Sequence, residues 1–318
     1  MSWIKGLSSM VKCAAMFSNL DSSETQPHIP DTYLADTRPI RVSSRKKKRG
    51  RRYLTLLVLV LALFLGLLLS PGRMNVLIIG LDRAPEGTSV ARSDTLILTS
   101  VQPHRPYAAM LSIPRDLWVE IPGVGYNRIN TAHFFAEGTR TGSGPAAAIS
   151  TIEHNFGIDI NEYIRLEFDG LVRFVDALGG VPISLESPVG KLGAGEYVLS
   201  GEQALAYVRD RSGTDDFFRM EHGRMFIQAV MKRMSQPSTW PRIPLALFQL
   251  SRNIETSLNP LEALRFGFTL VRVGPKGLIS RQITREMTTG FITDQGAQVL
   301  DPHWSLIHPM IHELFGSR

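Results

Sequence analysis

The sequence of 318 residues predicts an α/β fold preceded by one transmembrane helix. Three short apolar runs are rich in β-branched or aliphatic residues, as strands buried on both faces are. They lie at 75–80, 95–101 and 107–113. Residues 163–168 then alternate as a strand, 171–178 have helical spacing, and 181–185 are extended again after Gly-Gly. Strand, helix and strand in this order indicate an α/β sheet.

A transmembrane helix is predicted at residues 53–71. Its aliphatic stretch, 54–69, contains no charge and comes directly after a basic block at 45–52. The length is near the lower end of the roughly 17–25 residues that cross a bilayer core, so a buried core helix is the alternative. The basic flank predicts a cytoplasmic N-terminus and an extracytoplasmic position for the residues after the helix. The helix is not succeeded by a small-residue cleavage site, which favours an uncleaved signal anchor in the cell membrane.

The net charge divides the chain at the same place. Residues 1–52 hold 11 Lys and Arg against four acidic residues, which gives +7, and the total of +6 leaves −1 for the rest. The basic pI therefore belongs to a cytoplasmic tail, largely disordered, that faces anionic lipid. We expect no nucleic-acid partner. Cys13, the only cysteine, lies in this tail, so the exterior part has no disulfide.

The remaining segments complete the predicted domain organisation. Helical patterns occur at 131–137, 145–156, 200–207, 217–234, 260–271 and 304–315, and a strand pattern at 278–284. Prolines between 237 and 244 indicate a connector. We expect a catalytic core at 74–235 and a C-terminal extension, 236–318, packed on the same domain.

Two carboxylates flank the loop between the first two predicted strands. Asp82 comes after the first strand and Asp94 precedes the second, so a loop that doubles back brings them together. Paired carboxylates suit Mg²⁺, which fills its other positions with water and phosphate oxygens. The alternative is that both aspartates only cap turns.

Several arginines predict a phosphate site, because the guanidinium fork matches phosphate oxygens. Arg115 comes after a strand and a proline, although Asp116 offers it a simple surface ion pair. Arg209 and Arg211 point the same way if extended, and Arg219 shares a helical face with His222. A solvated basic face is the alternative for each arginine alone.

Other sequence motifs give little evidence for a function. There is no P-loop and no nucleophile elbow, so neither nucleotide binding nor serine hydrolysis is supported. His308 and His312 have the spacing of zinc ligands, but no glutamate stands beside the first and Pro309 lies between them. We therefore do not predict a zinc site.

Nine short motifs between Asn75 and Ala229 resemble the LytR-CpsA-Psr family in their order. They are Gly80-Leu81-Asp82-Arg83, Arg92-Ser93-Asp94-Thr95, Ser112-Ile113-Pro114-Arg115-Asp116, Ile121-Pro122-Gly123, Arg128-Ile129-Asn130, Phe168-Asp169-Gly170, Leu178-Gly179-Gly180-Val181, Gly201-Glu202-Gln203-Ala204-Leu205 and Tyr207-Val208-Arg209-Asp210-Arg211. The cytoplasmic tail with a single anchor is similar too.

The resemblance implies a central mixed sheet flanked by helices, with a hydrophobic pocket for a prenyl chain. It also implies a phosphotransferase of the glycopolymer–peptidoglycan ligase type. Such an enzyme moves teichoic acid, capsular polysaccharide or a comparable wall glycan from a polyprenyl-pyrophosphate carrier to a peptidoglycan hydroxyl, with Mg²⁺ as cofactor. The bilayer, the lipid-linked glycan and peptidoglycan are the implied partners.

The resemblance also assigns residues. Asp82 and Asp94 match the magnesium-associated acids, and the arginines that match the pyrophosphate ligands are Arg115, Arg209, Arg211 and Arg219. Of these, Asp82, Asp94, Arg115, Arg209 and Arg211 are the expected catalytic residues. Arg92 and Arg128 are further ligand candidates, and Arg128 stands where the family commonly has lysine.

The chain departs from the family after Arg219. His222, Gly223 and Arg224 stand where an arginine and two glutamines are common. Asp82 and Asp210 are both candidates for the general base. Two other functions stay open: a pyrophosphatase that transfers to water, and a noncatalytic membrane-anchored regulator or scaffold.

Overall fold

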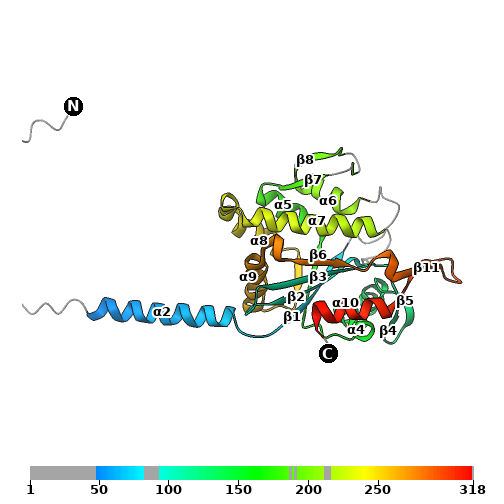
Figure 1. Cartoon of the computed structure of the whole chain (residues 1–318), viewed down its shortest axis with the longest axis horizontal. Coiled ribbons are helices and arrows are strands. Elements are labelled where there is room, and N and C mark those ends of the chain that lie inside the picture. Colours follow the sequence, from blue (N-terminus) through cyan, green and yellow to red (C-terminus); the bar gives the residue numbers. More distant parts are fainter. Residues whose placement is uncertain (1–47, 82–92, 186–187, 190–191, 211–215, 317–318) are drawn as a thin grey trace, which may run out of the picture. The chain divides into compact units, whose positions relative to one another are not determined.

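The computed structural model describes residues 48–81, 93–185, 188–189, 192–210 and 216–316. Its contacts divide the chain into two units, 1–57 and 58–318. The second unit contains all of the described strands (Figure 1). The predicted tail lies almost wholly outside the described residues.

Helix α2, Lys48–Leu68, covers residues 53–68 of the predicted transmembrane segment at 53–71. Its apolar side chains from Leu54 to Leu65 are exposed. Within the described residues, no helix combines the length and the apolar character needed to cross a bilayer. The structure therefore confirms a helix at this place but not its predicted crossing of a membrane.

A six-stranded mixed sheet forms the centre of the second unit, as the resemblance implied (Figure 1). In spatial order its strands are β10 (Ile279–Gln282), β3 (Tyr107–Ile113), β2 (Ser93–Gln102), β1 (Met74–Leu81), β6 (Glu162–Glu167) and β9 (Ile254–Thr256). β1 pairs antiparallel with β2 and parallel with β6, while β3 pairs antiparallel with β2 and parallel with β10. The residues after 236 thus supply both edge strands, β9 and β10.

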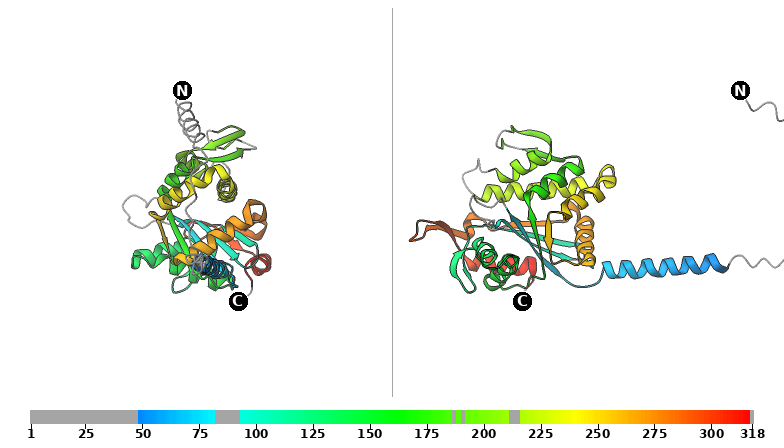
Figure 2. Two further views of the ribbon diagram at one scale, coloured as in Figure 1. Left: turned by 90° about the vertical axis from the view of Figure 1, so that its left-hand side faces the viewer. Right: turned by 180° about the vertical axis from the view of Figure 1, so that it is seen from behind.

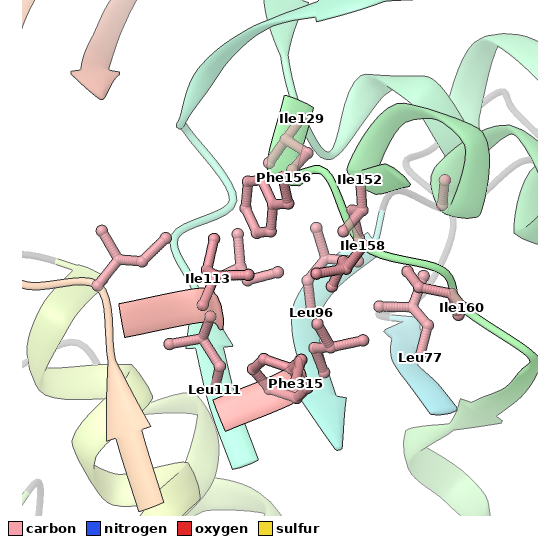
Figure 3. Packing of buried hydrophobic residues seen from close by; sticks show 14 of the residues in the cluster. Leu77, Leu96, Leu111, Ile113, Ile129, Ile152, Phe156, Ile158, Ile160 and Phe315 are labelled. Atoms are coloured by element: carbon pink, nitrogen blue, oxygen red, sulfur yellow. The ribbon is translucent and has the colours of Figure 1, made fainter. Parts of the chain in front are cut away.

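The first face of the sheet packs on helices α4 (Gly144–Phe156) and α10 (Trp304–Phe315). Side chains alternate along β1, so Leu77 and Ile79 point to this face. They join one buried cluster with Phe156 and Phe315 (Figure 3). Burial on both faces explains why the strands read as continuous apolar runs.

The second face packs on helix α9 (Pro260–Gly277), which begins at a capping box of Asn259 and Glu262. Val76 and Met110 point to this face and join a smaller cluster with Phe266. Helix α7 (Asp216–Ser235) lies on the same side of the sheet, opposite α4 and α10 (Figures 1 and 2).

A third cluster joins helices α5 (Phe168–Leu178), α6 (Gly201–Arg209) and α7 to a hairpin of β7 (Val181–Leu185) and β8 (Gly195–Leu199). The strand predicted at 181–185 therefore exists, but it does not enter the main sheet as the strand–helix–strand pattern suggested. Gly179 and Gly180, with φ of 77° and 83°, turn the chain directly after α5. A Cβ on Gly180 would lie 2.7 Å from Val198 of β8, so this turn sets the hairpin pairing.

The prediction of a connector at 237–244 is wrong. This segment forms the 3₁₀-helix η2 (Pro237–Arg242) and the start of helix α8 (Ile243–Ser251). Proline is tolerated in the first turn of a helix, because the backbone N–H groups there have no hydrogen-bond partner within the helix. Sequence patterns also missed two hairpins of short strands, β4 (Trp118–Ile121) with β5 (Gly125–Arg128), and β11 (Thr288–Ile292) with β12 (Gln298–Pro302).

The other predicted helices are confirmed. They are α3 (Thr131–Thr139), α4, α6, α7, α9 and α10. The short 3₁₀-helix η3 (Arg285–Met287) was not predicted. Helix α6 begins at a capping box, since Ser200 Oγ accepts a hydrogen bond from the Gln203 N–H while the Gln203 side chain accepts one from the Ser200 N–H.

Candidate active site

Asp94, Arg115 and Arg219 meet at one end of the second face of the sheet. Arg115 Nη1 donates a hydrogen bond to Asp94 Oδ1 at 2.6 Å. Arg219 Nη2 donates to the backbone oxygen of Asp94 at 2.6 Å, and its Nη1 lies 4.0 Å from Asp94 Oδ1. We call these three residues the arginine–aspartate cluster.

The sheet register explains why two members meet. β2 and β3 pair antiparallel with Leu96 opposite Ile113. Continuing that register by two residues places Asp94 beside Arg115, just past the proline that ends β3. Arg219 comes from the first turns of α7, on the side of the sheet where the second face lies.

The cluster is largely removed from water. The side chains of Arg115, Asp94 and Arg219 are 21%, 16% and 9% exposed. The three side chains carry two positive charges and one negative charge. Partial burial strengthens the attraction of the cluster for an anion compared with an exposed site. This arrangement can bind phosphate oxygens through directed N–H groups.

Two further ligand candidates, Arg209 and Arg128, contact neighbouring residues outside the cluster. Arg209 ends α6 and its guanidinium carbon lies 4.6 Å from the ring centre of Phe168. Arg128 Nε lies 3.3 Å from Asp116 Oδ1, and Asp116 Oδ2 lies 3.5 Å from Arg115 Nε. The ion pair of Arg115 and Asp116 is thus present, but the contact of Arg115 with Asp94 is much shorter.

Three predicted site residues, Asp82, Arg92 and Arg211, lie outside the described residues. The pairing of Asp82 with Asp94 therefore stays a prediction. Among the residues with described placement, no group of three His, Cys, Asp or Glu side chains is arranged for a metal. His308 stacks on Trp304, and its Nε2 lies 3.0 Å from the backbone oxygen of Asn155. These contacts indicate a structural role for His308.

Two adjoining cavities extend from the cluster along the second face. The first, of about 130 Å³, is lined by Asp94 and Arg219 together with apolar side chains. The second, of about 300 Å³, is almost wholly apolar and includes Phe174 and Phe266. The two share the lining residues Ile78, Leu166, Leu171, Phe226 and Ile227. An apolar cavity therefore adjoins one that has a polar end.

Sequence reasoning did not find these lining residues. The available signal was the width of the apolar surface on α7, where residues 226, 227, 230, 231 and 234 are all apolar. All five of these residues line the larger cavity.

The positions that depart from the family pattern lie beside the cluster. His222 stacks on Tyr207 with ring centres 4.8 Å apart. Burial lowers the pKa of His222, although Asp210 and Glu221 oppose this shift. Burial also raises the pKa of Tyr207 to about 12. Arg224 donates from Nε to Glu221 Oε2 at 3.0 Å and from Nη2 to Oε1, so it is paired within its own helix.

The LytR_cpsA_psr family model matches residues 46–303. The chain belongs to the LytR_cpsA_psr family. Its sequence is 34% identical over 192 residues to the polyisoprenyl-teichoic acid–peptidoglycan teichoic acid transferase TagU of Oceanobacillus iheyensis. That match covers 58% of this chain and 59% of the relative. The chain thus spans less than two thirds of the relative's length.

Solved structures share the fold of this family member. TagV of B. subtilis superposes with a TM-score of 0.65 at 25% identity, covering 78% of this chain and 99% of TagV. TagT bound to LIIa-WTA superposes with a TM-score of 0.63 at 23% identity, covering 78% of this chain and 92% of TagT. The central mixed sheet with flanking helices is therefore the fold of the family.

Proposed function

We propose that this protein transfers a glycopolymer from a polyprenyl-pyrophosphate carrier to a peptidoglycan hydroxyl. The observation that carries the proposal is the connection of the arginine–aspartate cluster to an apolar cavity. A prenyl pyrophosphate has the same two parts, a doubly charged head and a long apolar tail. The named activity of the TagU relative supports the same conclusion.

Charge neutralisation is the role we assign to the arginines. Arg115 and Arg219 direct N–H groups to one point from two different elements, and Arg209 is held nearby against Phe168. Phosphoryl transfer needs alignment and electrostatic stabilisation rather than covalent participation of the protein. Arg115 exchanges its bond with Asp94 for bonds to phosphate oxygens when the donor binds. The exchange is favoured because the pyrophosphate brings two negative charges where Asp94 has one, and partial burial strengthens both interactions.

The transfer itself forms one bond and breaks one. The acceptor hydroxyl oxygen bonds to the sugar-linked phosphorus, and the bond from that phosphorus to the bridging oxygen breaks. Polyprenyl phosphate leaves, and the hydroxyl proton passes to a base, for which Asp82 and Asp210 stay the candidates. The pyrophosphate supplies the driving force, so no nucleotide is needed.

Magnesium fits the donor set. Mg²⁺ is usually held by one or two carboxylates and by substrate phosphates. Asp94 supplies one carboxylate at the polar end of the cavity, and Asp82 is the predicted second ligand. When bound, the ion would neutralise phosphate charge beside Arg115.

We propose that helix α2 anchors the protein in the cell membrane as a single pass. The tail before it would be cytoplasmic and the catalytic domain extracytoplasmic, close to the lipid-linked donor and to peptidoglycan. A reporter fused to the C-terminus tests this topology. Activity of a reporter that works only in the cytoplasm would contradict it.

The decisive experiment incubates the purified full chain with a polyprenyl-pyrophosphate glycan, Mg²⁺ and peptidoglycan oligomers. We expect glycan-linked peptidoglycan with the wild type and with Arg224→Ala, and little with Arg115→Ala or Asp94→Ala. Equal product from all variants would refute the assigned site. Release of glycan phosphate into water would favour a pyrophosphatase, and no reaction with any donor would favour a scaffold.

A further inference from the structure

An exposed apolar surface lies at the end of the domain where α8 and α9 meet the larger cavity. Its members project from η2, α8 and α9, and we call them the apolar face. They are Trp240, Leu245, Leu247, Phe248, Leu261, Leu264 and Val271. Within α8 only Ala246 is buried, although seven of its nine residues are apolar. Soluble monomers rarely expose so many large apolar side chains together, so such a surface indicates a partner.

The same segment is strongly basic. Residues 232–278 hold seven Lys and Arg but only two acidic residues, Glu255 and Glu262. They contribute +5 to a region, 53–318, whose net charge is −1, so its other residues carry −6. Five of the basic side chains are exposed: Lys232, Arg242, Arg252, Arg272 and Lys276. Positive charge is thus concentrated around the apolar face.

A hydrogen bond places this end of the domain next to the start of the folded chain. Arg265 Nη2 of α9 donates to the Ser70 oxygen at 3.1 Å. Ser70 lies two residues after the end of helix α2. In the proposed topology, Ser70 is where the chain leaves the bilayer. The Arg265 bond then holds α9 at the level of the membrane surface.

The larger cavity opens at this end. Val271 lines the cavity and is 61% exposed, so it stands at the mouth. Leu250 of α8 lines the same space. Figures 1 and 2 show α8 and α9 at the same end of the domain. An amphiphile that entered here would bring its apolar tail in past α8 and α9.

We propose that η2, α8 and the outer side of α9 dock on the surface of an anionic lipid bilayer, with the mouth of the cavity facing the lipid. A surface that combines Trp, Phe and Leu with exposed Arg and Lys is typical of segments that lie in the membrane interface. The positive charge adds attraction to anionic headgroups. A second copy of the chain is a poor partner for this face, because two identical segments with a net charge of +5 each would repel one another. The identity of the molecule that enters the cavity from the lipid rests on the proposed function.

Depth-dependent quenching of a single label tests the docking. Cys13 is the only cysteine, so a Cys13→Ser background accepts one new cysteine. Leu245→Cys reports on the apolar face, and Val124→Cys in the β4–β5 turn is the matched control, with exposures of 55% and 54%. Figure 1 shows β4 and β5 at the other end of the domain from α8. The labelled full chains are reconstituted in vesicles of phosphatidylcholine and phosphatidylglycerol that contain a lipid-borne quencher.

We expect quenching at position 245 to exceed that at 124 at least three-fold. Arg242→Glu combined with Arg252→Glu should reduce the quenching at 245 by about half or more in these vesicles, and added salt should act in the same direction. Arg140→Glu, an exposed arginine of another surface, is the charge control and should change little. Equal quenching at both label positions would overturn the proposal. So would a label signal at 245 that depends on protein concentration in detergent, because that result assigns the face to a second copy.

Glycan transfer is measured in the same vesicles so that the two proposals fail separately. Quenching at 245 without transfer by the labelled protein would leave the docking and reject the proposed function. Transfer without preferential quenching at 245 would reject the docking and leave the proposed function. The chain has four tryptophans, so the quenched tryptophan fluorescence of the unlabelled wild type is compared with that of Trp240→Phe. The difference shows whether the label itself caused the contact.

Discussion

The two faces of the central sheet are built from alternate residues of the same strands, yet one is filled and the other is hollow. On the first face, Leu111 and Ile113 pack on Phe156 and Phe315 in a continuous cluster (Figure 3). On the second, Met110 borders a cavity of about 300 Å³. Close packing is the rule in protein interiors, so a space of this size indicates a ligand rather than a defect. If the proposed function is correct, the filled face mainly supports stability and the hollow face mainly binds the ligand.

Truncation of one phenylalanine on each face tests this separation most strongly. Phe156 is fully buried and its ring lies 5.6 Å from that of Trp304, so Phe156→Ala should lower the free energy of unfolding by about 3–5 kcal/mol. Phe266→Ala should cost less than half as much, because Phe266 already borders the cavity. Chemical denaturation measures both. Equal losses would show that the second face carries as much stability as the first.

Removal of one arginine should have the next largest effect, on catalysis alone. Arg115→Ala removes a donor from the cluster and should slow glycan transfer by about 10²–10³-fold, or roughly 2.7–4 kcal/mol in the barrier. Arg224→Ala is the matched control, since Arg224 bonds to Glu221 within α7. We expect the control to retain transfer within about two-fold. A comparable loss in both variants would mean that general charge, and not the cluster, serves the reaction.

Enlarging one valine on each face sharpens the comparison further. Val230 lines the cavity, so Val230→Phe should leave the melting temperature nearly unchanged and raise KM for the carrier about ten-fold, or 1.4 kcal/mol. Val119 is buried in the filled cluster, so Val119→Phe should destabilise the fold by about 1–3 kcal/mol. Thermal unfolding and donor titrations separate the two outcomes. Loss of stability in Val230→Phe would show that the cavity is smaller in solution.

The smallest effect concerns pH. Burial lowers the pKa of His222 below its ordinary value, with Asp210 and Glu221 opposing, so protonation favours the unfolded chain. The stability contributed by neutral His222 is therefore complete above about pH 6.5 and is lost as pH falls below that value. His222→Phe keeps a ring against Tyr207 but does not titrate. Its free energy of unfolding should fall less between pH 7 and 5 than that of the wild type, with exposed His104→Phe as the matched substitution. The same dependence of the free energy of unfolding on pH in the wild type and in His222→Phe would contradict this prediction.

The sequence predicted the strands well and their partners less well. The apolar runs at 75–80, 95–101 and 107–113 form β1, β2 and β3 because both faces of the sheet are covered. The same logic failed for 181–185, since local spacing does not report which strand lies alongside, and β8 was not foreseen. Prolines at 237–244 suggested a connector, but Pro237 and Pro244 lie in the first turns of η2 and α8, where proline is tolerated, and Pro241 lies within η2.

The candidate site was predictable in proportion to how local its contacts are. Asp94 meets Arg115 through the register of neighbouring strands, which the spacing of the two apolar runs suggests. Arg219 reaches Asp94 from α7, and only the family resemblance pointed to that meeting. The resemblance implied an apolar pocket, but residue patterns do not give its size, because that depends on how far α7 and α9 stand from the sheet. The roles of these residues stay predictions that the variants above test.

Both edges of the sheet are completed by the last part of the chain. β9 pairs with β6 and β10 pairs with β3, and both come after residue 253. During synthesis, the strands β1, β2, β3 and β6 are therefore finished while their outer neighbours are missing. Open strand edges pair readily with other chains. Unfinished or truncated copies should consequently aggregate, and a chaperone that binds extended segments would be most useful to this protein before β9 and β10 emerge.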